Sequence, residues 1–225
     1  MKQSALDLRL EPPRTFVNFV TGQNPQLLVA LHTLCTTPGT LYLWGDRACG
    51  KTHLLDASAG YARHLGRSVI KLNGSEVGED IEAPNNSLVV VDDVEMLSAE
   101  GQIALFTAWV RQRERELSLL VSGQSAPREL QVREDLRTRI GQAQLFAVQP
   151  LDDRAKIQAL RQHARAIGLK LTDDLLLYLL KQGLWDFGTM LAIIDELDRR
   201  CLEEKRTANF AMIRDAVQVI ENRPQ

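Results

Sequence analysis

The chain has 225 residues, of which 44% are hydrophobic and 25% charged, as in an ordinary globular protein with one large domain or two small ones. Its net charge of −2 and its pI near 6.1 give no overall basic field, so we expect no direct binding of duplex DNA. It has no apolar run long enough to cross a bilayer, no signal-peptide pattern and no C-x-x-C pair among its three cysteines. We therefore expect a cytoplasmic protein that contacts no membrane.

The first twelve residues have little of the apolar pattern typical of core segments, and a Pro-Pro pair follows at positions 12 and 13. This predicts a tail over 1–12. From 13 to 150, short apolar runs typical of buried strands alternate with amphipathic segments typical of helices. The strands are expected at 40–44, 68–72, 87–91, 117–122 and 144–148, and the helices at 26–35, 52–65, 99–114 and 133–140. This alternation predicts an α/β fold with a parallel five-stranded sheet covered on both faces.

The pattern changes after Pro150. Four segments with helical periodicity follow, at 152–167, 172–182, 187–205 and 209–221, with no strand pattern between them. Asp152 and Thr172 are suitable N-caps, and Gly168 and Gly183 are suitable C-terminal stops. We therefore expect a base domain over 13–150 and an all-helical lid domain over 151–225, a layout that resembles the AAA+ ATPases.

The most specific motif follows the first expected strand and opens a helix. It is G-x-x-x-x-G-K-T, formed by Gly45, Asp46, Arg47, Ala48, Cys49, Gly50, Lys51 and Thr52. Its glycines let backbone N–H groups turn inward around a phosphate. Lys51 adds a cation beside the β- and γ-phosphates, and the Thr52 hydroxyl can ligate Mg²⁺. The motif predicts a P-loop nucleotide-binding domain that holds ADP or ATP with Mg²⁺.

Two later strands end in polar residues that would meet the P-loop at one edge of the sheet. The third strand leads into Asp92, suited to hold the Mg²⁺ shell, and Asp93, suited to orient an attacking water, unless both are solvated loop acids. Glu95 is an alternative for the water, although we expect it to face solvent. After the fourth strand, Ser122 or Gln124 takes the position at which AAA+ proteins detect the γ-phosphate, with an ordinary polar loop as the alternative.

Two other groups have both a functional and a structural interpretation. Phe16, Phe19 and Val20 precede the first helix and are suited either to hold adenine or to pack in the core. Arg137 and Arg139 precede the last strand, where AAA+ proteins project an arginine toward the nucleotide of a neighbouring subunit. A guanidinium fits that role because its charge is permanent and its planar donors match phosphate oxygens. The alternative is that both arginines are solvated helix charges.

Several of these segments together resemble the AAA+ core of DnaA, the bacterial replication initiator. The resemblance is carried by residues 15–22, the P-loop, 91–93 and 136–141, and it covers nearly the whole chain. Three features of the initiators are missing. We expect no helix-turn-helix module after residue 221, no helicase-interaction domain before the tail, and no room between the second and third strands for the helices with which initiators build filaments.

A shortened DnaA relative of this kind is similar to the Hda family, the regulatory inactivators of DnaA. The tail segment 3–8 is similar to the Q-x-x-L-x-L peptide that binds the DNA polymerase III sliding clamp (its beta subunit), with Gln3 in one pocket and Leu6 and Leu8 in an apolar one. The resemblance implies a negative regulator of DNA replication initiation. Held on the clamp, it would present Arg139 as an arginine finger to ATP-bound DnaA and stimulate hydrolysis. The resemblance also allows a homo-oligomer.

One departure from the AAA+ pattern concerns the lid. Gly188 stands where the lid usually carries an arginine that contacts the γ-phosphate, so we expect weak or no intrinsic ATPase activity, with ADP or ATP as the bound nucleotide. A self-contained AAA+ ATPase, such as a helicase-loader-like protein, would need that arginine and contacts to single-stranded DNA. A small P-loop kinase would need an acceptor site and basic lid residues. The acidic pI and the balanced charge of residues 151–225 disfavour both alternatives.

Overall fold

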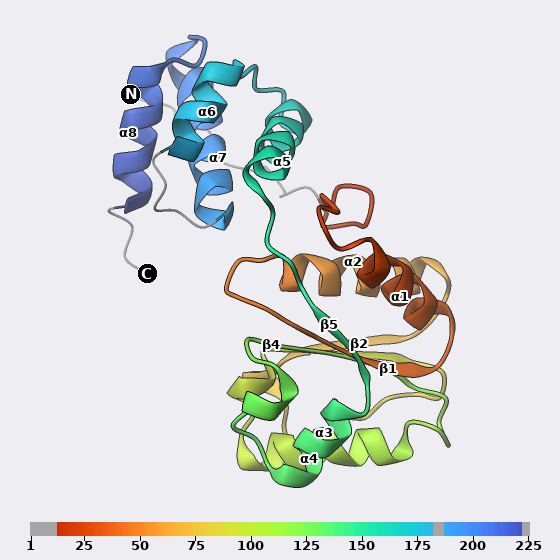
Figure 1. Cartoon of the computed structure of the whole chain (residues 1–225). Coiled ribbons are helices and arrows are strands. Elements are labelled where there is room, and N and C mark those ends of the chain that lie inside the picture. The colour runs from red at the N-terminus through yellow and green to blue at the C-terminus, as the bar shows by residue number, and fades with distance from the viewer. Residues whose placement is uncertain (1–12, 182–186, 222–225) are drawn as a thin grey trace, which may run out of the picture.

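The computed structural model describes residues 13–181 and 187–221. A five-stranded sheet with helices on both faces lies beside a separate bundle of helices (Figure 1). The strands are β1 (Gly39–Trp44), β2 (Val69–Asn73), β3 (Leu88–Asp92), β4 (Ser118–Gly123) and β5 (Gln144–Ala147). Their order is β2-β3-β4-β1-β5, and every neighbouring pair is parallel. The expected parallel sheet is confirmed, with strand ends that differ by one residue or less.

The central strands β3 and β4 are the most deeply buried. Every residue of β3 and of β4 is buried, as expected for central strands of a parallel sheet that is covered on both faces. The edge strand β5 is partly exposed, and its Leu145 is 41% exposed. Because β3 and β4 are buried along their whole length, the positions of the polar residues at their carboxyl ends are closely fixed.

Four longer helices cover the sheet. The helices α1 (Pro25–Thr36) and α2 (Lys51–His64) lie on one face, and α3 (Ala99–Arg111) and α4 (Glu134–Gly141) lie on the other (Figure 1). Each face has its own apolar core, with Leu54 and Leu55 of α2 in one and Leu105 and Trp109 of α3 in the other. Short 3₁₀ helices are formed by Gly74–Glu76, Val94–Met96 and Pro127–Glu129.

The end of α3 differs from the expected one. The polar periodicity predicts a helix that continues to residue 114, whereas the structure ends it at Arg111 and turns the chain through Glu116, whose φ is +52°. The side-chain amide of Gln112 donates a hydrogen bond to the Leu117 carbonyl at 2.7 Å and so stabilises that turn. The earlier end brings the chain into β4 without a long connection.

The remaining helices form a bundle with a core of its own. They are α5 (Asp153–Ala166), α6 (Asp173–Lys181), α7 (Phe187–Glu204) and α8 (Phe210–Glu221). Asp152 caps α5 by accepting a hydrogen bond from the Ala155 N–H at 2.8 Å, and Gly168 has the left-handed φ of +82° typical of a residue just past a helix end. The predicted stop at Gly183 lies outside the described residues. The expected helical unit after Pro150 is confirmed.

The topology brings distant segments to one edge of the sheet. Because all five strands are parallel, the residues that follow β1, β3 and β4 lie at the same edge, with β3 and β4 adjacent and β4 next to β1. They are the P-loop after β1, Asp93 after β3 and the residues 124–125 after β4, and Asp92 and Ser122 lie beside them at the ends of β3 and β4. No helix in the described ranges is long and apolar enough to span a membrane.

Candidate nucleotide-binding site

The loop between β1 and α2 is bent so tightly that its glycines are required. Gly50 has a φ of +104°, and a Cβ there would lie 3.1 Å from the ring of Phe19. A Cβ on Gly45 would lie 3.0 Å from both the Cys49 Sγ and the Val148 carbonyl oxygen. Asp46, Arg47 and Ala48 form the exposed arc between them. The loop therefore has the compact form that a phosphate cradle needs.

Lys51 directs its charge into this loop. Its Nζ donates to the carbonyl oxygens of Gly45 at 2.7 Å and Asp46 at 2.9 Å, and the residue is only 7% exposed. It is also the first residue of α2, where unpaired backbone N–H groups and the positive end of the helix dipole favour an anion. The loop, the helix start and the ammonium group together fit a bound polyphosphate.

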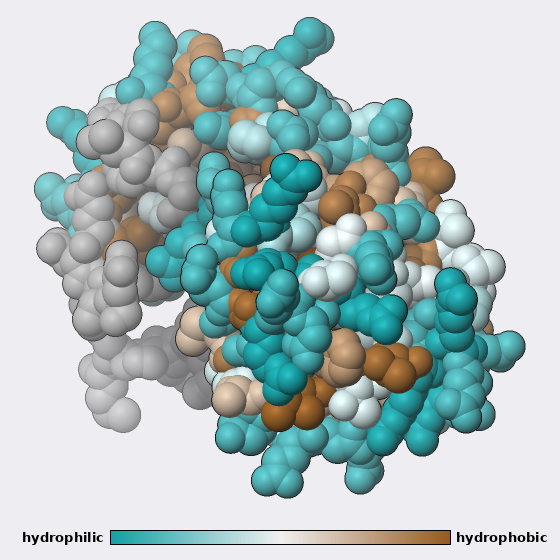
Figure 2. All heavy atoms as spheres, turned by 60° about the horizontal axis from the view of Figure 1, so that its bottom comes forward, coloured by the Kyte–Doolittle hydropathy of each residue, from teal (hydrophilic) through white to brown (hydrophobic). Residues whose placement is uncertain are grey.

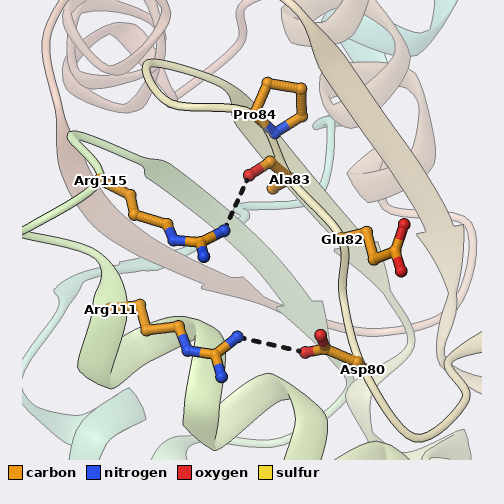
Figure 3. Close-up of a pocket in the computed structure, with 6 residues that line it drawn as sticks. All are labelled: Asp80, Glu82, Ala83, Pro84, Arg111 and Arg115. Carbon is orange, nitrogen blue, oxygen red and sulfur yellow. Dashed lines mark hydrogen bonds and ion pairs between the residues drawn. The ribbon is translucent and has the colours of Figure 1, made fainter.

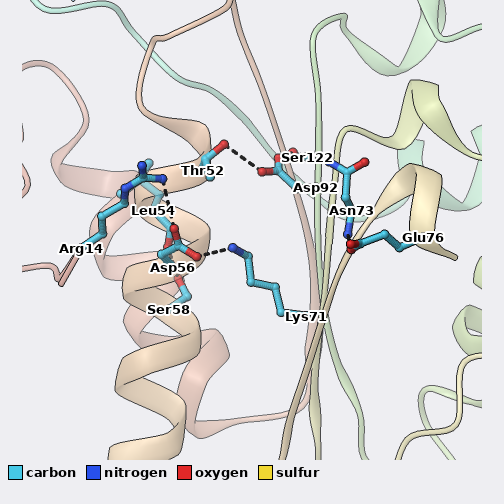
Figure 4. Close-up of polar contacts among 10 residues, drawn as sticks. All are labelled: Arg14, Thr52, Leu54, Asp56, Ser58, Lys71, Asn73, Glu76, Asp92 and Ser122. Atoms are coloured by element: carbon cyan, nitrogen blue, oxygen red, sulfur yellow. Dashed lines mark hydrogen bonds and ion pairs between the residues drawn. The ribbon is translucent and has the colours of Figure 1, made fainter. Parts of the chain in front are cut away.

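Asp92 is the centre of a buried hydrogen-bond chain across two strands (Figure 4). Thr52 donates its hydroxyl hydrogen to Asp92 Oδ2 at 2.8 Å, and the Ser122 hydroxyl donates to Oδ1. The Ser122 Oγ also accepts a hydrogen bond from the Asp93 N–H at 3.1 Å. Asp92 is 6% exposed and Ser122 is fully buried. Two hydroxyl donors fix the Asp92 side chain beside the Thr52 oxygen, a pair of hard oxygen ligands that fits Mg²⁺.

Asp93 has a different environment from Asp92. Its φ is +56°, which turns the chain sharply at the end of β3. Burial, followed by the negative charge of Asp92, raises the pKa of Asp93 above its ordinary value, and a hydrogen bond from the Asn73 side chain opposes that rise. A carboxyl group with a raised pKa is a better proton acceptor than an ordinary one, as a water-orienting base requires.

The expectation that Glu95 faces solvent is wrong. Its Oε1 accepts hydrogen bonds from the backbone N–H groups of Gln124 at 2.6 Å and Ser125 at 3.3 Å, and its Oε2 is buried without a hydrogen-bond partner in the described part of the chain. The Tyr42 hydroxyl donates to the Ser125 carbonyl at 2.7 Å. Burial and then the Glu95 charge raise the pKa of Tyr42 well above its usual range. Glu95 therefore anchors the segment that follows β4.

The segment ahead of α1 lies against α2. It places the three residues that are candidates for the adenine contact in different surroundings. Phe16 packs away from the P-loop, with its ring centroid 4.3 Å from that of His32. Phe19 lies over Gly50, and its ring centroid is 5.4 Å from that of His53. Val20 is partly buried. Of the three, Phe19 is the residue that the structure brings to the P-loop.

Polar contacts hold the same segment in place. His53 Nε2 lies 3.0 Å from the Thr15 carbonyl oxygen, and Arg14 Nη1 lies 3.2 Å from Asp56 Oδ2. Figure 4 shows that Lys71 of β2 also contacts Asp56, so one carboxylate of α2 bridges the segment and the sheet. Burial lowers the pKa of His53, and the Thr15 carbonyl partly opposes that shift. His53 is therefore mainly neutral near pH 7.

Arg139 is not brought to this site. It is exposed on α4, on the sheet face opposite α2, and its Nη1 lies 3.5 Å from Gln142 Oε1 (Figure 1). Arg137 is half-buried on the same helix and forms no ion pair with a carboxylate within the described residues. Gly188 is the exposed second residue of α7. The tail residues Gln3, Leu6 and Leu8 lie outside the described residues.

A hollow lies near the amino ends of β3 and β4, away from the P-loop. Its volume is about 560 Å³, and it is lined by Asp80, Glu82, Ala83, Pro84, Arg111 and Arg115 (Figure 3). Arg115 donates to the Ala83 carbonyl at 3.4 Å, and Arg111 lies 3.6 Å from Asp80. The chain's own acceptors thus face both guanidinium groups, and the hollow is separate from the P-loop.

Comparison with known proteins agrees with the geometry. The family model for the lid domain of Hda matches residues 153–216. Among solved structures, domain III of Thermotoga maritima DnaA has a TM-score of 0.75 at 16% identity and covers 96% of this chain and 100% of its own. AMPPCP-bound DnaA from Aquifex aeolicus has a TM-score of 0.68 at 17% identity, covering 94% and 82%. The Thermotoga maritima RuvB branch-migration motor has a TM-score of 0.71 at 15% identity, covering 92% and 72%.

A parallel sheet with a P-loop after β1 and a helical lid after β5 defines the AAA+ class of P-loop proteins. The lid match and the likeness to DnaA domain III place the chain more closely. Residues 153–216 match the lid domain of Hda, and the chain as a whole has the fold of DnaA domain III.

Proposed function

We propose that this protein is a nucleotide-bound regulator of replication initiation that stimulates the hydrolysis of ATP on DnaA. The observation that carries the proposal is the position of Arg139. This arginine is exposed on α4, on the sheet face opposite the helix that its own P-loop opens. A cation placed in this way is suited to a nucleotide held by another protein, and the lid match to Hda supports DnaA as that protein.

The chain's own nucleotide would be ADP or ATP. The backbone of Gly45–Thr52 and the Lys51 ammonium would hold the phosphates, and Phe19 would contact the base. Thr52 and Asp92 would hold Mg²⁺, which neutralises phosphate charge when bound. Ser122 would position Asp92, which leaves the exposed Gln124 as the residue better placed for the γ-phosphate.

The reaction in trans would need little from this chain except correct placement of a charge. As the γ-phosphoryl group of DnaA-bound ATP is transferred to water, negative charge spreads over its oxygens. The planar guanidinium of Arg139 would stabilise that charge through parallel N–H donors. Arg137 is the alternative candidate for the arginine finger, because it lies on the same helix and has no carboxylate partner among the described residues.

We further propose the division 1–12, 13–150 and 151–225 into tail, base and lid. The tail would bind the sliding clamp through Gln3, Leu6 and Leu8 and so concentrate the protein where clamp is loaded on DNA. Direct binding to duplex DNA is not part of this function, because the net charge is −2.

A second function, a self-contained AAA+ ATPase, is favoured by one observation. Asp93 has a raised pKa and lies next to Asp92, as a water-orienting base in the chain's own site would. Gly188 weighs against it, because a glycine offers no cation to the γ-phosphate. The deciding experiment measures ATP hydrolysis by DnaA alone, by this protein alone, and by both together with DNA-loaded clamp. Our proposal predicts hydrolysis mainly in the third mixture, whereas fast turnover by this protein alone would favour the second function.

A further inference from the structure

Glu95 connects the chain that follows β3 to the chain that follows β4. It lies in the 3₁₀ helix Val94–Met96, which is fixed by the fully buried Val94. Its Oε1 accepts hydrogen bonds from the N–H groups of Gln124 at 2.6 Å and Ser125 at 3.3 Å. The 3₁₀ helix therefore holds the backbone of the segment after β4 from one side.

The carboxylate of Glu95 turns inward although the chain reaches the surface at the next residue, Met96, which is 59% exposed. Figure 2 turns the end of the molecule with α3 and α4 toward the viewer, and much of the surface there is polar. Glu95 Oε2 is instead buried and has no hydrogen-bond partner in the described part of the chain. Burial of a carboxylate oxygen without a donor costs free energy. Such a group needs a physical reason, and the two N–H groups on Oε1 supply one.

Tyr42 of β1 holds the same segment from a second side. Its hydroxyl donates to the Ser125 carbonyl oxygen at 2.7 Å, and its fully buried ring stacks on Trp44 with 5.8 Å between the ring centroids. Gly123 lies against both anchors, because a Cβ there would overlap the Tyr42 hydroxyl and lie 2.7 Å from Glu95 Oε1. The backbone from 123 to 125 therefore has a closely defined path.

These contacts fix the backbone of Gln124 and leave its side chain exposed. Because β4 lies next to β1, whose carboxyl end leads into the P-loop, Gln124 is at the edge of the sheet where the phosphates would lie. A side-chain amide can donate a hydrogen bond to a phosphate oxygen. ATP has a γ-phosphate and ADP has none, so a donor at this place distinguishes the two nucleotides.

We propose that Glu95 is a positioning residue that holds Gln124 for contact with the γ-phosphate and so sets the preference of this chain for ATP over ADP. The inference deepens the nucleotide-bound state of the proposed function and rests on it. Glu95 would act only through the backbone of Gln124. Its loss would therefore weaken the binding of one nucleotide, whereas the loss of a merely structural group would weaken the binding of both.

The test measures the binding of Mg-ADP and of Mg-AMPPCP, a non-hydrolysable ATP analogue, to the full chain by isothermal titration calorimetry. The variants are E95A, E95Q, E95D, Q124A and E95A/Q124A. E129A is the matched control, because Glu129 is exposed at the end of the next 3₁₀ helix, Pro127–Glu129. Thermal unfolding followed by circular dichroism checks that each variant is folded.

We expect Q124A and E95A to raise the Kd for Mg-AMPPCP about tenfold and to change the Kd for Mg-ADP by less than about twofold, because only the γ-phosphate loses a donor. E95A/Q124A should bind no more weakly than Q124A, because two changes in one path do not add. E95Q should bind like the wild type, because an amide oxygen can accept the same two N–H groups. E95D, whose shorter side chain reaches the N–H groups less well, should give a smaller selective shift, and E129A should give none.

Equal weakening of both nucleotides in E95A would overturn the inference. So would an unchanged Kd for Mg-AMPPCP, an additive double variant, or an E95Q that binds like E95A. If E95A does not fold, E95D decides the question. A selective loss of Mg-AMPPCP affinity in E95D supports the inference, and an equal change or no change for the two nucleotides overturns it.

The binding assay contains no DnaA, so it separates the inference from the proposed regulation. Selective loss in E95A, in a protein that does not stimulate ATP hydrolysis by DnaA, would support the inference and overturn the proposed regulation. Normal stimulation by the wild type, with an unselective change in E95A, would overturn the inference alone. A wild type that binds neither nucleotide would overturn both the inference and the nucleotide-bound state.

Discussion

Ser122 donates its hydroxyl hydrogen to Asp92, and the same Ser122 oxygen accepts the backbone N–H of Asp93. One buried hydroxyl therefore connects the end of β4 to both acidic residues at the end of β3. The other oxygen of Asp92 accepts from Thr52, the second residue of α2. The site is thus a continuous chain of hydrogen bonds across β4, β3 and the P-loop helix.

Ser122→Ala should break this chain of hydrogen bonds and leave only a small cavity. The variant removes one donor from the buried Asp92 carboxylate and leaves the Asp93 N–H unpaired, so we expect a loss of about 1–3 kcal/mol in the free energy of unfolding. Urea denaturation measures it. Ser75→Ala, at an exposed serine after β2, is the control and should be nearly neutral. Equal stability of the two variants would show that the Ser122 hydrogen bonds contribute little.

Lys51→Ala should weaken nucleotide binding. The ammonium group lies in the loop, and a hydrogen bond to a charged group contributes roughly 1.5–3 kcal/mol, so we expect Kd to rise about tenfold or more. Isothermal titration calorimetry with Mg-ADP and Mg-ATP measures the change. Arg63→Ala, at the other end of α2, should bind like the wild type. If Lys51→Ala binds both nucleotides normally, this loop is not the phosphate site.

His53 should make stability fall in mild acid. Burial lowers the pKa of His53 in the folded state below its ordinary value of 6.5, so between these two values the unfolded chain binds more protons than the folded one. The contribution of neutral His53 is therefore present above pH 6.5 and is lost as the pH falls toward the lowered pKa. Urea unfolding at pH 7.5 and pH 5.5 should show a larger acid loss for the wild type than for His53→Gln. Equal losses would contradict the assignment.

Clamp binding should depend on the tail. Replacing Gln3, Leu6 and Leu8 by alanine removes the side chains that match the clamp-binding peptide, and we expect the affinity for the clamp to fall below detection. Surface plasmon resonance on immobilised clamp measures the affinity. The thermal unfolding midpoint of the triple variant checks that it is folded. A triple variant with normal clamp affinity would rule out the tail as the tether.

The strands and the P-loop were predictable from the sequence because their signals are local. The run Leu88-Val89-Val90-Val91 is buried throughout, and the glycine spacing of the P-loop matches a loop in which Gly50 has a φ of +104°. The role of Glu95 was not predictable, since its partners are the N–H groups of Gln124 and Ser125, which only the pairing of β3 with β4 brings near. The hydrogen bond from the Ser122 hydroxyl to Asp92 depends on the same pairing of β3 with β4.

The end of α3 was missed for a related reason, and the sequence left Phe16, Phe19 and Val20 open between an adenine contact and core packing. Residues 112–116 keep a helical polar pattern, and the turn there is stabilised by the contact of Gln112 with the Leu117 carbonyl. Phe16 and Phe19 look alike in sequence, yet one packs on His32 and the other on the P-loop. Local patterns report periodicity, whereas these outcomes depend on packing against distant elements.

The central claim is that Arg139 acts on a nucleotide held by another protein. The most direct measurement is the rate of hydrolysis of DnaA-bound ATP with DNA-loaded clamp and either wild-type protein, Arg139→Ala, Arg139→Lys or the control Arg137→Ala. The account predicts that Arg139→Ala binds nucleotide and clamp normally but loses stimulation by ~10³-fold or more, since loss of an arginine finger leaves the transition-state charge unstabilised. Arg139→Lys should rescue little, and Arg137→Ala should stimulate like the wild type. Full stimulation by both alanine variants would contradict the claim.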